Sequence, residues 1–415
     1  MVLSADPAQD LSELITHIPE NTVLLFSSDT HPGVMPSPSA TSITGKIPVE
    51  YFTDHEIILK NGQDMIGAAD DGFEIVIRDR PEFKHRHLIR VGTAKNFQYG
   101  ETKGSHIKHI TFRPTGNDKR DPLDAIVFAE CSNRKLIIEN NRFHSPFRAA
   151  TALDCRQSLD ASAADWLQGP ALRFANNRII GKESNPVIAK RSTHVIPNQG
   201  LWINLPAITS QSGQLSVIGN TFEGYMAKAG EFRLASGTHI KVFKNKIDIA
   251  NASSSDGGLV LEGPAKPVTS PAFFLAGNQI RATQTAITVR GQLGLTLACN
   301  HLQAVIPWWQ PQKQFSLQVP LKTPGEVTNV CDDIVSSTVA SSTPNTLGSS
   351  RLTNTWTAIK NSVATACSGL SHLEGQLLFD TEVCQPVTPS TSAAGTTAVT
   401  MGLGVMATLA MLLNL

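Results

Sequence analysis

Basic residues recur at one position of a repeated sequence motif, where they could bind anionic groups. The residues that directly follow six similarly placed asparagines are Arg142, Arg178, Thr221, Lys246, Gln279 and His301. Two more basic residues, Arg173 and Lys241, lie inside the apolar segments before two of those asparagines. Because Arg and Lys suit uronate, sulfate and phosphate groups, the pattern predicts a basic stripe that binds an acidic polysaccharide. The alternative is a solvated face whose charges discourage edge pairing.

Three carboxylates are the best candidates for catalysis. Cleavage of a glycosidic bond requires two carboxyl groups about 5 Å or about 6.5–9.5 Å apart. The combination that the sequence offers is Asp154 with Glu139 or Asp121, on or beside an insertion at residues 155–170. These three residues are therefore the catalytic candidates under an enzymatic alternative. The crowding of acidic residues around Asp121 is more typical of a solvated turn than of a cation site.

Two adjacent aromatic residues form a third candidate site. Trp308 and Trp309 lie between Pro307 and Pro311, and aromatic rings on a rigid loop can stack on sugar rings. The pair joins the basic residues as a predicted sugar-binding element, with coverage of the last coil of the fold as the competing role.

The densest basic run of the chain lies at residues 78–90. Its basic members are Arg78, Arg80, Lys84, His85, Arg86, His87 and Arg90. Alternation along a strand would put some of them on an exterior face, and the alternative reading is an ordinary polar loop or strand face.

The elements that position these residues follow from a motif written six times: apolar, any, apolar, two residues, Asn, any, apolar. The copies occupy residues 136–143, 172–179, 215–222, 240–247, 273–280 and 295–302. Apolar residues two apart indicate strands, and the Asn marks a sharp turn between two of them. Four of the six residues before the Asn are Asn or Gly, which tolerate a positive φ. We expect each Asn to point inward and to stack on the next in an amide ladder, and Phe143, Phe174 and Phe222 to lie in the core.

A second apolar strand precedes several copies, at residues 126–128, 201–203, 259–261 and 287–289. Self-similarity of this kind marks a repeat architecture, here with at least two strands in each coil. The chain resembles the right-handed parallel β-helix, or pectin-lyase-like, superfamily over residues 21–320. The resemblance implies an all-β solenoid, but lyases, hydrolases, esterases, adhesins and phage tailspikes share this fold, and a fold does not imply a function.

The catalytic sets of that superfamily are not visible in this chain. The resemblance implies, for a uronate lyase, an Arg or Lys base beside a carboxylate cluster that holds Ca²⁺. No acidic column on consecutive coils occurs here, and the motifs of the polygalacturonase-like and esterase members cannot be assembled. We therefore expect no cofactor, with Ca²⁺ involved only under the lyase alternative, and no metal site, because no Cys/His metal spacing occurs.

The remaining sequence divides into a start and two C-terminal segments. Residues 1–20 are predicted to form an N-terminal cap helix that begins at Asp6-Pro7 and buries Leu11, Leu14 and Ile15. Residues 321–393 read as a Ser/Thr-rich linker with an amphipathic helix, and residues 394–415 as a hydrophobic, transmembrane segment. This segment leads us to expect attachment to a membrane, at the cell surface. The first residues do not resemble a secretory signal, which conflicts with the usual extracellular location of the fold.

Composition narrows the class of partner. Lys plus Arg and Asp plus Glu both number 35, so no overall field favours nucleic acid. The sequence predicts a membrane-attached β-helix that binds acidic glycans or acts as an adhesin-like rod without catalysis. The first alternative is a polysaccharide lyase or glycoside hydrolase of this superfamily, and the second is a purely structural rod.

Overall fold

A computed structural model describes the chain in segments. These are residues 1–30, 45–91, 104–115, 122–130, 135–154, 171–181, 198–205, 214–250, 258–264, 271–283, 285–290, 293–298, 301–305 and 315–318. All of them belong to one compact unit, Met1–Phe379.

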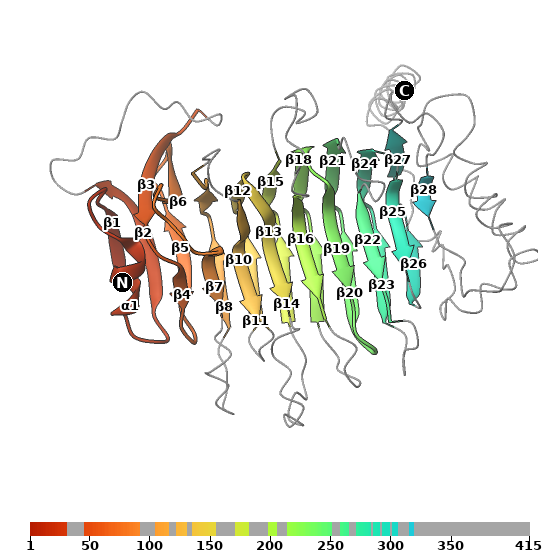
Figure 1. Cartoon of the computed structure of the whole chain (residues 1–415), viewed down its shortest axis with the longest axis horizontal. Coiled ribbons are helices and arrows are strands. Elements are labelled where there is room, and N and C mark those ends of the chain that lie inside the picture. The colour runs from red at the N-terminus through yellow and green to blue at the C-terminus, as the bar shows by residue number, and fades with distance from the viewer. Residues whose placement is uncertain are drawn as a thin grey trace, which may run out of the picture. The chain divides into compact units, whose positions relative to one another are not determined.

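The described strands form three sheets, in which every pairing is parallel (Figure 1). Sheet A contains, in order, β1 (Val2–Ala5), β2 (Val23–Thr30), β5 (Asp64–Ala68), β8 (Ser105–Lys108), β11 (Lys135–Glu139), β14 (Ala171–Ala175), β17 (Gln214–Ile218), β20 (His239–Phe243), β23 (Ala272–Ala276) and β26 (Gly294–Ala298). Sheet B contains β3 (Ile47–Thr53), β6 (Phe73–Asp79), β9 (Thr111–Phe112), β12 (Arg142–His144), β15 (Arg178–Ile180), β18 (Thr221–Tyr225), β21 (Lys246–Ala250), β24 (Gln279–Thr283) and β27 (His301–Val305). Sheet C contains β4 (Ile57–Leu59), β7 (His87–Val91), β10 (Leu123–Glu130), β13 (Phe147–Asp154), β16 (Gln199–Asn204), β19 (Lys228–Arg233), β22 (Leu259–Glu262), β25 (Thr285–Arg290) and β28 (Phe315–Gln318).

The chain visits the sheets in a fixed rotation. From β2 onward each strand of sheet A is followed by one of sheet B and then one of sheet C, and the next strand of sheet A pairs with the previous one. This arrangement is a three-sheet parallel β-helix, which confirms the fold class predicted from the repeated motif.

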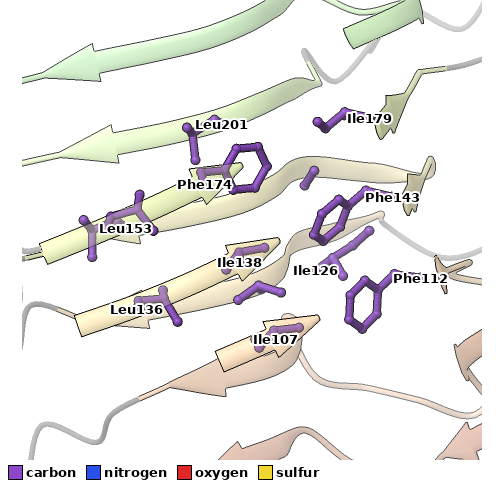
Figure 2. Close-up of a cluster of buried hydrophobic side chains, with 14 of the residues drawn as sticks. Ile107, Phe112, Ile126, Leu136, Ile138, Phe143, Leu153, Phe174, Ile179 and Leu201 are labelled. Atoms are coloured by element: carbon purple, nitrogen blue, oxygen red, sulfur yellow. The ribbon is translucent and has the colours of Figure 1, made fainter. Parts of the chain in front are cut away.

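Aromatic and aliphatic side chains fill the interior of the coils. The rings of Phe112, Phe143 and Phe174 stack from coil to coil, with centroid separations of 5.1 and 6.1 Å. Figure 2 shows these rings beside Ile107, Ile126 and Leu136. Phe143, Phe174 and Phe222 are buried as expected. Phe143 and Phe222 are the inward residues that follow the turn of their repeats, and Phe174 is the inward residue that precedes it.

The repeated asparagines form the predicted ladder at the turn between sheets A and B. The amide oxygens of Asn177, Asn220, Asn245 and Asn278 each accept a hydrogen bond from the backbone N–H of the preceding Asn in the series, at 2.8–3.0 Å. Their amide nitrogens donate to carbonyl oxygens of earlier coils, such as that of Phe174. The residues before them have positive φ: Asn140, Asn176, Gly219, Lys244 and Gly277. The ladder therefore satisfies buried backbone groups that the tight turn takes out of the sheets.

The start of the chain differs from the prediction. Residues 2–5 form a strand, and helix α1 (Leu11–Thr16) begins after Asp10 rather than at Asp6. Asp10 accepts from the N–H of Ser12 and also from that of Asp54, a contact with the next coil that a helix starting at Asp6 would not make. Leu11 and Ile15 are buried as expected, whereas Leu14 is only partly buried against the core. Helix α1 packs on β3 and β4, the first strands of sheets B and C.

The predicted linker at 321–393 and the hydrophobic segment at 394–415 lie outside the described residues. Within those residues, no helix has both the length and the apolar character that crossing a bilayer requires. Membrane attachment thus stays a prediction.

Candidate functional site

The residues of the predicted basic stripe occupy one row of sheet B. Arg142 lies opposite Arg178, and the row continues through Thr221, Lys246, Gln279 and His301. Arg173 and Lys241 instead lie on sheet A, in one row with Ser216 between them. The predicted stripe is therefore divided between two sheets, because the asparagine turn separates the positions before and after it. The side chain of His301 is outside the description.

Carboxylates offset much of the positive charge of the stripe. Arg142 lies 3.5 Å from Glu74, and Arg178 lies 2.7 Å from Glu223. Arg173 is paired with Glu139, which also contacts Lys108 at 3.2 Å, whereas Lys241 and Lys246 are exposed. A row of ion pairs attracts a polyanion less strongly than a row of bare cations, so this face is a weaker site than its sequence indicates.

The structure does not bring two of the catalytic candidates together. Glu139 ends a strand of sheet A, and Asp154 ends a strand of sheet C. Burial raises the pKa of Glu139, but hydrogen bonds from Arg173 and Lys108 outweigh it and lower the pKa overall. This carboxylate is thus held ionised in a structural ion pair. Asp121 lies outside the described residues, so its combination with Asp154 stays a prediction.

Of the two other predicted elements, one lies outside the described residues and one is largely paired with carboxylates. Trp308 and Trp309 lie outside the described residues. The basic run at 78–90 is largely paired with carboxylates: Arg78 with Glu50, Arg80 with Asp54, Arg86 with Asp124, and both His87 and Arg90 with Glu56. Across the described segments, no group of three or more His, Cys, Asp or Glu residues is placed to hold a metal ion.

A different surface, on the outer face of sheet C, combines apolar and polar groups. Ala125, Ala149 and Ala152 pack with Phe128 and Trp202 in a cluster separate from the core. Phe128 and Trp202 each stand between two buried residues of their strands, which is why their rings point outward. We name these five residues, with the polar row described next, the sheet C patch.

The two rings of the patch lie on either side of a small residue. Phe128 is opposite Ala152, and Ala152 is opposite Trp202. Two strand spacings of ~4.8 Å place the aromatic side chains ~9.6 Å apart. Because alanine projects less from the sheet than either ring, the rings stand above the strand between them.

A polar row runs beside the rings. Asp154 and Asn204 are register partners, and the Asn204 amide donates to the Asp154 carboxylate at 2.9 Å. Both face outward yet are only 6% and 1% exposed. The row continues with Arg233, whose guanidinium donates to Oε2 of Glu262 at 3.2 Å and whose Nε lies 2.9 Å from Oε1 of the same carboxylate. These donors and acceptors are therefore held in fixed geometry.

Neighbouring residues support the patch at both ends. The His87 ring stacks on Phe128, with centroids 4.1 Å apart, and its Nδ1 contacts Glu56 at 2.9 Å. On the other side Glu231 lies opposite Trp202 and pairs with Lys228 at 2.7 Å. An aromatic surface edged by fixed hydrogen-bonding groups is the chemistry that sugar recognition uses, because sugars present apolar ring faces and a rim of hydroxyls.

Sequence analysis did not identify this patch. The sequence predicts the strand segments 126–128 and 201–203, but their register is offset by one residue. Phe128, the last residue of the first segment, and Trp202, the middle residue of the second, both lie opposite Ala152. The available signal was one aromatic residue within an apolar run of each strand. A register shift of one residue moves a side chain to the other face, so the offset concealed the shared outward position.

Comparisons with known proteins give little further information. No family model and no curated protein matches the chain. A structure search finds the A-module of the Azotobacter vinelandii mannuronan C-5 epimerase AlgE6, at 10% sequence identity and a TM-score of 0.20, covering 73% of this chain and 92% of that one. The likeness is too weak to add to the argument from this chain's own geometry.

Proposed function

We propose that the protein binds a polysaccharide along the outer face of sheet C, without cleaving it. The observation that supports this most directly is the aromatic cluster of Phe128, Trp202 and the three alanines, which lies outside the core. Aromatic side chains are costly to keep at a surface unless they cover or bind something. In this proposal the two rings contact sugar rings, and Arg233 with Glu262, the accessible end of the polar row, binds hydroxyl groups.

The rigidity of the patch supports binding rather than general adhesion. Both rings stand on central strands of a sheet, and the Asp154–Asn204 pair is already formed without a ligand. Groups held in place before binding lose little conformational entropy when a ligand arrives. A flexible sugar chain would therefore meet a prearranged row of contacts spaced by the coils.

The charges of the patch favour a neutral glycan over a strongly acidic one. Arg233, its basic member, is paired with Glu262, and the neighbouring Lys228 is paired with Glu231. An acidic polysaccharide, expected from the stripe of sheet B, would gain less from sheet C than a neutral one.

A glycan array with the full-length protein tests this proposal. Trp202→Ala should weaken binding at least about tenfold, which corresponds to the ~1.4 kcal/mol or more that a central aromatic anchor contributes. Phe274→Ala is the matched control, because Phe274 is a half-buried, outward-facing aromatic residue of sheet A. Its binding should equal that of the wild type.

Two results would contradict the proposal. Equal loss of binding in both variants, or in neither, would mean that the sheet C patch is not the contact face. Release of reducing or unsaturated ends from a bound glycan would show that the protein is an enzyme, and would redirect mutagenesis to Asp121 and Asp154.

A further inference from the structure

A separate group of basic side chains surrounds a histidine on the outer face of sheet B. His144 and Arg142 lie on the same side of β12, because Phe143 between them points into the core. Arg178 is the register partner of Arg142. Arg113 directly follows Phe112, the partner of Phe143, and so comes beside His144. We name these four residues the sheet B cluster.

The carboxylates near the cluster do not fully neutralise it. Arg178 pairs closely with Glu223, at 2.7 and 2.8 Å. Arg113 and Arg142 share one carboxylate, that of Glu74, each at 3.5 Å. These separations exceed the ~2.7–2.9 Å of a charge-assisted hydrogen bond. Among the described residues, three guanidinium groups thus face two carboxylates, which leaves one positive charge in excess.

The register makes this excess unfavourable in the absence of a ligand. Arg142 and Arg178 are directly opposite on adjacent parallel strands, and like charges in that position repel. Neither can move far, since both Cα atoms are fixed by sheet hydrogen bonds and the asparagine ladder lies directly before them. An anion between the guanidinium groups would remove the repulsion.

We propose that the sheet B cluster binds an oxyanion, meaning a sulfate, phosphate or carboxylate group, between Arg142 and His144. Arg113 approaches from one neighbouring strand and Arg178 from the other. Guanidinium groups bind such oxygens in pairs of hydrogen bonds, and the imidazole adds a donor. The site lies on a different sheet from the sheet C patch and does not depend on the proposed glycan binding.

The histidine gives the site a defined pH dependence. Burial lowers the pKa of His144 to about 4. The Arg113, Arg142 and Arg178 guanidinium groups also lower this pKa, and the Glu74 carboxylate opposes them. A bound anion would reverse much of this effect, because it favours the imidazolium form. Affinity for the anion should therefore increase as the pH falls below the pKa of the bound form, and level off near pH 4.

A titration of the full-length protein with sodium sulfate, at constant ionic strength, tests the site by NMR. The chain contains 12 histidines, so His144→Gln identifies the His144 ring signal by its absence. We expect that signal to shift with saturation, and its pKa to increase by at least one unit in saturating sulfate. A shift that sodium chloride reproduces, or that does not saturate, would overturn the proposal.

Two variants and a matched control locate the anion. Arg142→Gln and Arg178→Gln should each weaken sulfate binding about tenfold, and having two keeps the test valid if one variant folds poorly. Arg281→Gln is the control, because Arg281 is also on sheet B and also ion-paired, with Asp248 at 2.8 Å. Equal affinity in all three would overturn the proposal. Trp202→Ala should leave sulfate binding unchanged, so this site and the glycan proposal fail separately.

The same titration distinguishes two sources of the anionic group. A sulfated oligosaccharide that binds at least tenfold more tightly than inorganic sulfate, but not after desulfation, would identify a group attached to a glycan. Equal affinity for both would identify a site for the free ion. Absence of His144 shifts with either probe would contradict the proposal.

Discussion

The outer faces of sheets B and C belong to the same coils but present different chemistry. On sheet B the outward row is charged, and its arginines are tied to Glu74 and Glu223. On sheet C the outward row is aromatic and small, beside the fixed Asp154–Asn204 pair. The interior that supports both is the same stacked core and the same ladder. The comparison shows that in a β-helix the inward residues decide the fold, while the outward residues of each sheet can differ freely.

The largest expected effect comes from damage to the shared support. Asn220→Ala removes the acceptor of the Asn177 N–H and the donor to the Phe174 carbonyl, both buried. Two unsatisfied buried groups, at about 1–3 kcal/mol each, should lower the free energy of unfolding by about 2–6 kcal/mol. Urea denaturation measures this, and glycan and sulfate binding should decrease together as the fold is lost.

Thr221→Ala provides the matched control for the ladder. Thr221 follows Asn220 directly and faces outward on sheet B, so its truncation should change the free energy of unfolding by less than about 0.5 kcal/mol. If Asn220→Ala changed the free energy of unfolding as little as Thr221→Ala, the asparagine ladder would not be the common support of the two faces.

A smaller effect is the pH dependence of stability that His144 gives to the sheet B face. The pKa of His144 is about 4 in the folded protein, against an ordinary value of 6.5, so the unfolded chain binds a proton more readily between these values. The stability that this histidine contributes is therefore fully present above pH 6.5 and is lost as the pH falls toward 4. For a half-buried group we expect this loss to be about 2 kcal/mol.

Replacement of the histidine isolates that contribution. Thermal or urea unfolding of His144→Gln from pH 7 to pH 4 should show a flatter dependence of stability on pH than the wild type. His239→Gln, which changes an exposed histidine of sheet A, should retain the wild-type slope. Identical slopes in all three proteins would mean that the sheet B cluster does not hold His144 neutral. The electrostatic difference between the faces of sheets B and C would then lack support.

Sequence reasoning succeeded where the relevant chemistry is local to the repeat. The Asn at the turn and the positive φ before it involve adjacent residues, so the motif alone predicted the ladder and the row from Arg142 to His301. It did not identify the ion pairs, because Glu74 and Glu223 come from other coils and stand outside the motif. It also missed the shared position of Phe128 and Trp202, since insertions of variable length separate the strands of sheet C and leave their register unmarked. At the start of the chain the sequence favoured Asp6, because Pro7 follows it, and it did not indicate the contact of Asp10 with Asp54, which comes from a distant part of the chain.

The smallest effect concerns the turn that lies between sheets A and B and belongs to neither face. Lys244 has φ 55°, whereas the equivalent residues of the adjacent coils are Gly219 and Gly277. A left-handed conformation costs a lysine more than it costs an asparagine, whose short polar side chain tolerates it. Lys244→Asn should therefore raise the free energy of unfolding by about 0.5 kcal/mol, and Lys244→Val should lower it by at least about 1 kcal/mol, because a β-branched residue fits this region poorly. Both variants should bind glycan and sulfate like the wild type. A change in either affinity would show that the turn transmits its conformation to the faces, and that the outward rows are less independent than the contrast between sheets B and C implies.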